Sequence, residues 1–398
     1  MRVFVAFDKF KDALGAAEAC RIAADALRVL QPAWQIDVCP LADGGDGFAA
    51  VLTQVANGEL RRVKVTGPLG ESVEANYGVI PVANLTPEVC ALLGIQNQKF
   101  SSAQHLDPIE NAATVAVIEM AQASGLALVP PAQRNPWRTT TRGTGELILA
   151  AARDGVSAIV VGVGGSATHD VGLGALGALG LTAHAADDSR IANPIPETWA
   201  ALAKVGGRIA ADLPPIFVAT DVTNPLMGTF GAANVFGPQK GLLEEDFTRL
   251  EYMTGRVAAM LCAQAGKHPL LCETPGCGAA GGLAFGLHCT ANAKLLPGFD
   301  FVSAWLGLEA RLAAADVVLT GEGSFDASSL QGKAPGEVAR RAHALGKKVH
   351  VFAGRVTTPP EGFHAHPITP PGTELADALR GTPQHLAHSV RSVFTSSS

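Results

Sequence analysis

The densest set of chemically active residues lies in one run, TGEGSFDASSLQGKAP. Two carboxylates in it can hold Mg²⁺ or orient a hydroxyl group, a lysine can neutralise a phosphate, and glycines let backbone N–H groups approach an anion. The run directly follows DVVL, which has the character of a buried strand. The pattern predicts a phosphate- and metal-binding loop, with a solvated, helix-capping turn as the alternative. The residues concerned are Gly321, Glu322, Gly323, Asp326 and Lys333.

A second acidic loop, ADGGDG, lies near the N-terminus. Asp43 and Asp46 stand on either side of Gly44 and Gly45, in a turn that opens a helix, so carboxylates and backbone donors face one place. Either carboxylate is a candidate metal ligand or general base. Because aspartate also favours helix starts for structural reasons, an N-cap is the alternative role.

The first predicted strand ends in AFDKFKD, which supplies Asp8, Lys9 and Lys11. Alternate side chains of an extended segment point in opposite directions. We therefore expect only one of the two lysines to point into a binding site.

The segment GVGGSATHD permits two interpretations. Gly162, Gly164 and Ala167 fit the dinucleotide fingerprint G-x-G-x-x-[GA], and Asp187 follows about twenty residues later, as a ribose-binding acid would. Gly-Gly-Ser turns after strands also bind other phosphates or carboxylates, which makes Ser166 a candidate contact for a small anionic substrate.

Three more loops past predicted strands contain candidate ligand-binding side chains. RNPWRTTTRGTGEL gathers three arginines around a Thr-rich turn, and a guanidinium can pair with a carboxylate or phosphate through two parallel hydrogen bonds. We expect one of these arginines, Arg134, Arg138 or Arg142, to bind ligand and the others to lie at the surface. ATDVTNPL supplies Asp221 and Asn224, and VFGPQKGL supplies Lys240, each with a purely structural role as the alternative.

Composition excludes several classes of protein. The 398 residues are 47% hydrophobic and carry a formal net charge of −6 without a basic stripe, so nucleic acid is not an expected partner. The N-terminus lacks the pattern of a signal peptide, and the uncharged stretch Val171–Ala186 is too short to cross a bilayer. Seven scattered cysteines lack the spacing of zinc ligands. We expect a cytoplasmic protein with no membrane partner.

The elements that position these loops follow one pattern. An apolar run ends in a loop of glycine and aspartate and leads into Ala/Leu-rich helical spacing, which predicts βα units and a parallel sheet. Ligands bind outside the carboxyl ends of such strands. The segments are VFVAFDKFKD, IDVCPLADGGDG, AIVVGVGGSATHD, PIFVATDVTNP, DVVLTGEGSFD and KKVHVFAGRV.

We expect two α/β domains. Residues 1–62 and 291–398 would form a discontinuous, Rossmann- or flavodoxin-like domain, and residues 63–290 an inserted α/β domain. The boundary precedes RRVKVTGPLGESVEANYGVI, whose alternation predicts an antiparallel hairpin turning at Pro68–Gly70. Residues 81–112 read as a surface insertion or flap.

Taken in order, ten motifs resemble the bacterial glycerate kinase type 1 family over roughly residues 1–355. Their collinearity is far more specific than any single motif. The resemblance implies two α/β domains with the active site in the cleft between them, and transfer of the ATP γ-phosphoryl group to D-glycerate with Mg²⁺, usually giving 2-phosphoglycerate. The motifs are AFDKFKD, ADGGDG, VTGPLGE, AVIEMAQASGL, PPAQRNPWRTTTRGTGEL, GVGGSATHD, DVTNPL, VFGPQKG, GAAGGL and TGEGSFDASSLQGKAP.

With this resemblance, each candidate residue receives an expected role. Asp326 would be the base or a Mg²⁺ ligand, Lys333 would bind phosphate, and Arg142 or Lys11 would bind the glycerate carboxylate. We expect catalytic roles for Asp326, Lys333 and Asp43; substrate contacts from Asp8, Lys11, Arg142, Ser166, Asp221 and Asn224; nucleotide contacts from Gly44, Gly45, Gly321, Glu322, Gly323 and Lys240; and metal ligation by Asp46 and Asp326. A homodimer is a further expectation.

The chain also departs from the family pattern. Phe7 and Lys9 replace the proline and serine of A-P-D-S-F-K, Arg142 stands where an aromatic residue is common, and residues 81–112 are an insertion. Two other functions stay open at this point. One is an NAD-dependent dehydrogenase of a small hydroxy acid, based on the dinucleotide fingerprint, and the other is a non-catalytic ligand-binding relative.

Overall fold

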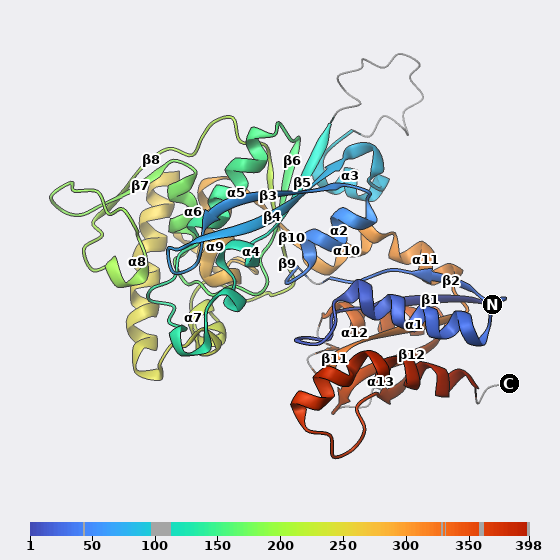
Figure 1. Cartoon of the computed structure of the whole chain (residues 1–398). Coiled ribbons are helices and arrows are strands. Elements are labelled where there is room, and N and C mark those ends of the chain that lie inside the picture. Colours follow the sequence, from blue (N-terminus) through green and yellow to red (C-terminus); the bar gives the residue numbers. More distant parts are fainter. Residues whose placement is uncertain (43, 97–112, 328, 331, 358–361, 396–398) are drawn as a thin grey trace, which may run out of the picture. The chain divides into compact units, whose positions relative to one another are not determined.

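The computed structural model describes residues 1–42, 44–96, 113–327, 329–330, 332–357 and 362–395. The chain divides into two compact units, each built from helices and strands (Figure 1). Unit 1 comprises Met1–Asp43 and Val302–Ser398, and unit 2 comprises Gly44–Phe301. The expected α/β class and the discontinuity of the first domain are therefore confirmed.

Unit 1 is built on a five-stranded parallel sheet in the order β13-β12-β11-β1-β2. The strand β1 lies near the middle of the sheet, although it is the first element of the chain. The strands are β1 (Arg2–Phe7), β2 (Gln35–Val38), β11 (Val317–Phe325), β12 (Lys348–Val356) and β13 (His364–Pro367).

Helices cover both faces of this sheet. Val3, Val5 and Phe7 of β1 pack with α1 and α13, whereas Phe4 points the opposite way, toward the guanidinium of Arg311 on α11. Alternate residues of β1 thus pack against helices on opposite faces of the sheet. This is the arrangement with helices on both faces that the βα pattern predicts. The helices are α1 (Ala16–Leu30), α11 (Leu308–Ala314), α12 (Ala334–Ala344) and α13 (Leu375–Thr395).

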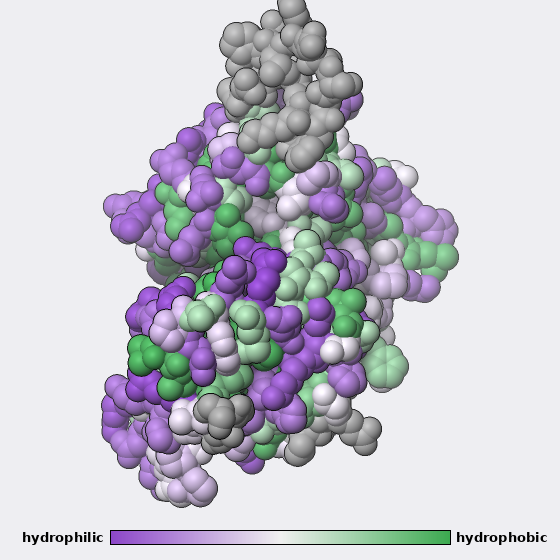
Figure 2. Space-filling model, turned by 90° about the vertical axis from the view of Figure 1, so that its right-hand side faces the viewer, coloured by the Kyte–Doolittle hydropathy of each residue, from purple (hydrophilic) through white to green (hydrophobic). Residues whose placement is uncertain are grey.

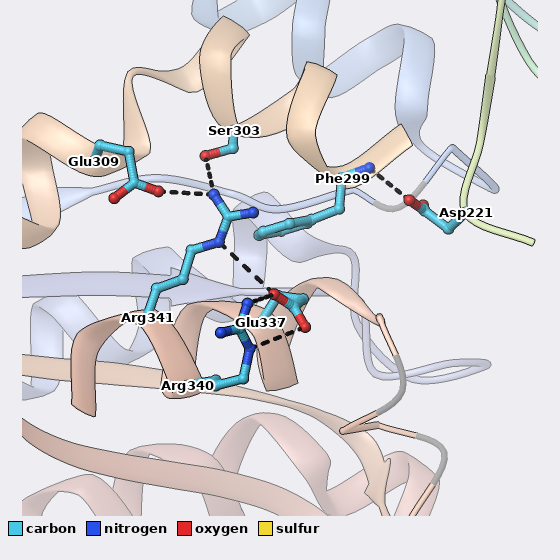
Figure 3. Close-up of polar contacts among 7 residues, drawn as sticks. All are labelled: Asp221, Phe299, Ser303, Glu309, Glu337, Arg340 and Arg341. Carbon is cyan, nitrogen blue, oxygen red and sulfur yellow. Dashed lines mark hydrogen bonds and ion pairs between the residues drawn. The ribbon is translucent and has the colours of Figure 1, made fainter. Parts of the chain in front are cut away.

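A cluster of charges holds α12 in place (Figure 3). The guanidinium of Arg341 donates to Glu309 Oε1 at 2.7 Å and to Ser303 Oγ at 3.1 Å, and it lies 3.7 Å from a carboxylate oxygen of Glu337. Glu337 also pairs with Arg340. These contacts orient the helix that begins directly after Lys333.

Unit 2 is built on a six-stranded mixed sheet in the order β10-β9-β6-β5-β4-β3. The pairs from β10 to β5 are parallel, and β5-β4 and β4-β3 are antiparallel. The β3–β4 pair confirms the predicted hairpin. The strands are β3 (Glu59–Thr66), β4 (Ser72–Pro81), β5 (Thr114–Glu119), β6 (Ala158–Gly162), β9 (Ile216–Thr220) and β10 (Lys294–Pro297), with a separate antiparallel pair β7 (Leu181–His184) and β8 (Lys204–Gly207).

The central strands of unit 2 are buried along almost their whole length, as expected when helices cover both faces of a parallel sheet. Ala75, Tyr77 and Val79 of β4 belong to the large hydrophobic core that includes α5 and α9, whereas Gly78 lies against Thr53 of α2 on the other face. The helices are α2 (Phe48–Val55), α3 (Pro87–Leu93), α4 (Ala121–Ser124), α5 (Arg142–Arg153), α6 (Leu173–Ala178), α7 (Ala232–Phe236), α8 (Phe247–Ala265) and α9 (Ala279–Thr290). The boundary between the units falls within α10 (Gly298–Leu306).

The unit boundaries differ from the expected division after residue 62 and before residue 291. The helix α2 packs on β3, β4 and β5, and β10 pairs with β9, so both elements join unit 2. These contacts are between segments distant in sequence, which the local pattern does not encode. Unit 2 therefore begins earlier and ends later than expected.

The expected insertion at residues 81–112 is described in its first half only. It contains a 3₁₀ helix, Val82–Asn84, and then α3, which buries Val89, Cys90 and Leu93. Residues 97–112 lie outside the described part of the chain.

None of the described helices is long and apolar enough to cross a membrane. On the face visible in Figure 2, hydrophilic and hydrophobic residues are interspersed in small patches.

Two helical glycines of unit 2 make a matched test of packing. A Cβ on Gly145 of α5 would lie 2.3 Å from the carbonyl oxygen of Ala175 on α6, whereas a Cβ on Gly177 of α6 would meet nothing within 4 Å. We expect Gly145→Ala to lower the free energy of unfolding by about 1–3 kcal/mol through overpacking. Gly177→Ala should leave it unchanged or raise it by up to about 1 kcal/mol through helix propensity.

Urea unfolding of both variants, followed by circular dichroism, measures this difference. Equal midpoints for Gly145→Ala and Gly177→Ala would contradict the close α5–α6 contact.

Candidate active site

Unit 1 contains a cavity of about 870 Å³ beyond the carboxyl ends of β1, β11, β12 and β13. Ligands bind in this position in parallel sheets, and the volume is typical of sites for small molecules. Acidic, basic and apolar side chains all line it. The charged ones are Asp8, Lys9, Lys11, Asp12, Glu322, Asp326, Lys333 and Arg355. The structure thus brings together seven residues singled out in the sequence: Asp8, Lys9, Lys11, Glu322, Gly323, Asp326 and Lys333.

Glycines allow the two loops of this cavity to meet. A Cβ on Gly321 would lie 1.7 Å from the carbonyl oxygen of Phe352, and a Cβ on Gly323 would lie 3.2 Å from the backbone nitrogen of Lys11. The backbone N–H of Asp8 also donates to the carbonyl of Gly321 at 3.0 Å. Gly321 therefore lets β11 lie against its neighbour β12, and Gly323 lets the TGEGSFD loop approach the backbone of the AFDKFKD loop.

Lys333 combines two sources of positive potential. It is the N-cap residue of α12, and the first turn of a helix carries partial positive charge from its unpaired N–H groups. Its ammonium lies 4.0 Å from Glu322 Oε2, with 40% of the lysine side chain and 11% of the glutamate side chain exposed. This pair leaves the ammonium open to the cavity, in keeping with the expected phosphate role.

Short hydrogen bonds shape the loop around Asp326. Ser329 Oγ accepts from the backbone N–H of Asp326 at 3.1 Å, and the backbone N–H of Ser329 donates to the carbonyl of Asp326. On the neighbouring loop, Asp8 Oδ1 accepts from the N–H of Lys9 at 2.7 Å. These bonds hold the backbone of Asp326 and the carboxylate of Asp8, and both residues line the same cavity.

The glycine turn of ADGGDG belongs to unit 2. The N–H of Gly164 donates to the carbonyl of Gly44 at 3.0 Å, and a Cβ on Gly164 would lie 2.6 Å from the Cα of Gly45. A Cβ on Gly165 would lie 2.9 Å from Asp46 Oδ1. The loop after β6 therefore lies directly on the Gly44–Asp46 turn, and Asp43 lies outside the described residues.

Sequence reasoning missed Glu119, the last residue of β5. It is only 2% exposed, and its Oε2 accepts from the N–H groups of Gly47 and Ala49 at 2.9 and 3.4 Å, at the start of α2. Burial raises the pKa of Glu119 to about 7, and the nearby charge of Asp46 adds to the rise. A lone glutamate after an apolar run gave no signal in the sequence, because its partners lie about seventy residues away.

A second buried carboxylate, Asp170, ties the start of α5 to the loop after β6. It accepts from the N–H and the hydroxyl of Thr141, both at 2.8 Å, and from the N–H groups of Gly172 and Gly174. Burial raises the pKa of Asp170, and these four hydrogen bonds oppose the rise. The carboxylate thus closes the turn that precedes α6.

Lys240 occupies the same buried region rather than an open loop. Its ammonium donates to the carbonyl of Thr168 at 2.7 Å, and the residue is 2% exposed. Burial lowers the pKa of Lys240 to about 7, while Asp170 acts in the opposite direction. His169 beside it bonds Thr254 through Nε2, and burial lowers the pKa of His169 to about 3. These contacts support a role for Lys240 in holding the loop.

Arg142 and Ser166 lie at the same edge of unit 2. Arg142 is the first residue of α5, and its Nε donates to Glu146 Oε1 at 3.0 Å. Together with Arg190 it lines a small depression near α6. Ser166 is buried and forms an isolated β-bridge with Gly125. Of the two, Arg142 has the more accessible polar group.

Asp221 and Asn224 have structural contacts. Asp221 Oδ1 accepts from the N–H of Phe299 at 2.6 Å, at the start of α10 (Figure 3). The side-chain amide of Asn224 donates to the carbonyl of Phe230 at 2.8 Å. Their expected substrate contacts stay predictions.

The dinucleotide fingerprint lacks the structural context that it requires. A helix should begin within the glycine motif, but after β6 the chain continues as a loop until α6 starts at Leu173. Asp187 lies in the exposed turn between β7 and β8, where it accepts hydrogen bonds from Ser189. The dehydrogenase interpretation is therefore not supported.

Among the described residues, no group of three or more histidine, cysteine, aspartate and glutamate side chains is arranged to hold a metal ion. Mg²⁺ needs no such cage, since one or two carboxylates and substrate phosphates commonly bind it.

Comparison with known proteins decides the family. A model of the glycerate kinase family matches residues 3–397. The chain belongs to this family. Glycerate 2-kinase of Escherichia coli (strain K12) is 34% identical over 99% of this chain and 97% of its own length, and glycerate kinase of Bacillus subtilis (strain 168) is 34% identical over 100% and 97%. A crystal structure described as that of a glycerate kinase 2 from Salmonella typhimurium LT2 aligns with a TM-score of 0.77 at 35% identity, covering 100% of this chain and 98% of that chain.

The match to the glycerate kinase family extends beyond the motifs. These end near residue 335, whereas the family match continues to residue 397 and includes β12, β13 and α13. The C-terminal segment that closes one side of the unit 1 cavity is thus part of the family's common chain.

The buried Glu119 predicts an unusual pH dependence of stability. Its folded-state pKa of about 7 lies above the ordinary value of 4.5, so its contribution is fully present below pH 4.5 and is lost as pH rises through 7. We expect the free energy of unfolding to fall by up to about 3 kcal/mol over that range. The side chain in Glu119→Gln stays neutral, so the free energy of unfolding of this variant should fall less between pH 5 and 8 than that of the wild type.

Urea unfolding of the two proteins at several pH values in this interval is the measurement. Parallel pH profiles for the wild type and Glu119→Gln would show that Glu119 is ionised throughout.

Proposed function

We propose that this chain transfers the γ-phosphoryl group of ATP to the 2-hydroxyl group of D-glycerate. The observation that carries the proposal is membership of the glycerate kinase family over residues 3–397. ATP follows from membership of a kinase family, and the name of the Escherichia coli relative, glycerate 2-kinase, supports the 2-hydroxyl as acceptor. The unit 1 cavity adds the charged groups that such a transfer needs.

Phosphoryl transfer asks a protein mainly to align two substrates and to offset negative charge. We assign Lys333 to the phosphates, because its ammonium lies at the cavity wall beside the positive end of α12. Gly321 and Gly323 lack side chains, so backbone N–H groups of this loop can approach the phosphates. Glu322 Oε2 lies 4.0 Å from the ammonium of Lys333 and helps to position it. The expected position of the site between the two domains stays a prediction.

Asp326 is our candidate for the group that accepts the hydroxyl proton or holds the metal. Mg²⁺ prefers oxygen ligands, and the carboxylates of Glu322 and Asp326 line one cavity with Lys333, so the donor set fits the ion. Asp326 would hold Mg²⁺ in unit 1, with Asp46 of unit 2 as a second candidate. When bound, the ion would offset charge on the phosphates. Asp43 stays a candidate from the sequence alone.

The glycerate carboxylate requires a cation. Lys11 in unit 1 and Arg142 in unit 2 are the two candidates, because both have exposed charged groups beside carboxyl ends of strands. Asp8, Ser166 and the Gly44–Gly45 turn remain predicted ligand contacts. The homodimer and the cytoplasmic location also stay predictions from the sequence.

The assay that tests the function measures ADP release from Mg-ATP with D-glycerate, with L-glycerate as control and phosphorus NMR of the product. We expect turnover that depends on D-glycerate and a phosphorus resonance coupled to the proton on carbon 2. A folded protein that releases no ADP with D-glycerate contradicts the proposal, and a product phosphorylated on carbon 3 contradicts the acceptor position.

Removing the carboxylate of Asp326 tests its role. Asp326→Asn should lower kcat by about 10² or more, the typical contribution of a general base. Asp25→Asn makes the same charge change on the exposed face of α1, where Asp25 pairs with Arg28, and should leave kcat unchanged. Steady-state kinetics and thermal unfolding of both variants are the measurements; near-normal turnover of folded Asp326→Asn rules the role out.

A further inference from the structure

One wall of the unit 1 cavity is apolar and comes from the C-terminal segment. Leu375, Ala378, Leu379 and Thr382 of α13 all line it. Their spacing of three and four residues puts them on one face of the helix. Pro367 and Pro371, at and after the end of β13, extend the same wall.

The rest of that helix face is anchored in the core. Leu386, Val390 and Phe394 continue the stripe and are buried against α1 and the sheet. The helix is therefore held firmly by its last turns, while its first two turns face the cavity.

Leu375 gives the clearest indication of an apolar ligand at this wall. It lines the cavity and yet is 73% exposed. Apolar surface gains free energy when it leaves water, so an anchored apolar wall beside a cavity favours a ligand with an apolar face. The first turns of α13 therefore expose apolar side chains to the cavity, although its last turns are packed in the core.

The same cavity also holds cationic side chains beside an equal number of carboxylates (Asp8, Asp12, Glu322 and Asp326), so it suits a polyanion that binds together with Mg²⁺. Lys11, Lys333 and Arg355 contribute cationic side chains, and Lys9 adds a fourth. A ligand that satisfies both properties has an apolar, flat part and a polyanionic part. A purine nucleotide has this chemistry, whereas glycerate is a small, wholly polar acid that would leave the apolar wall uncovered.

We propose that this cavity binds the nucleotide of ATP, with the purine base against Leu375 and Leu379 of α13 and the phosphates toward Lys333. The C-terminal segment then determines affinity for the base, and the loops after β1 and β11 determine affinity for the phosphates. The inference rests on the proposed kinase function for the identity of the nucleotide, but the base site is tested by binding alone.

The test is isothermal titration of the full-length protein with Mg-ADP and, separately, with Mg-pyrophosphate. In the double variant Leu375→Ala/Leu379→Ala we expect ADP to bind about tenfold more weakly, because several CH₂ groups no longer cover the base. Pyrophosphate has no base, so its affinity should stay unchanged. Leu345→Ala, on an exposed leucine that follows α12 and does not line the cavity, is the matched control and should bind both ligands normally.

Each other outcome overturns the assignment. Unchanged ADP affinity in the double variant places the base elsewhere, and an equal loss for ADP and pyrophosphate shows a general distortion of the cavity. A KM effect confined to glycerate assigns the wall to the acceptor, and a wild-type protein that binds no ADP excludes a nucleotide site. The titrations measure binding and need no turnover, so they test the base site independently of the glycerate kinase activity. Thermal unfolding checks that the substitutions leave the fold intact.

Discussion

Backbones that touch without intervening side chains determine where the loops of both units lie. In unit 1 the Cα of Gly321 faces the carbonyl of Phe352 so closely that a single methyl group would overlap it. In unit 2 the same constraint acts between Gly164 and Gly45. Glycine is the only residue that permits these contacts. Glu322 directly follows Gly321, and Asp46 directly follows Gly45, so both contacts act on the backbone beside these carboxylates.

The two units use their charges differently. In unit 2 the carboxylates of Glu119 and Asp170 and the ammonium of Lys240 are buried and bonded to backbone groups of neighbouring loops. Buried ionisable groups are costly unless fully hydrogen-bonded, so their value lies in fixing loop geometry. In unit 1, by contrast, Lys333 and Asp326 line a cavity open to solvent, where a ligand can meet them. These three groups of unit 2 therefore hold its loops in place, whereas Lys333 and Asp326 of unit 1 can contact a ligand.

Local patterns in the sequence predicted the repeated βα units, the β3–β4 hairpin and the cavity-lining residues of the TGEGSFD loop, because each depends on residues close together in the chain. They did not reveal that α2 packs on β4 or that Glu119 caps α2, because these contacts join distant segments. The apolar face of α13 was missed for a related reason. Its first half lines a cavity and its second half a core, and periodicity alone cannot separate the two. Substrate identity came from collinear motifs and not from physical reasoning about any one of them.

The place of β1 in its sheet has a consequence for how the protein is made. This strand, residues 2–7, is synthesised long before its neighbour β11, which begins at residue 317. At about 5–20 residues per second, roughly 15–60 s pass before that neighbour is synthesised. Unit 2 is continuous in sequence and can fold during this interval, while β1 has only β2 as a neighbour in its sheet. The sheet of unit 1 can therefore be completed only after all of unit 2 has been synthesised.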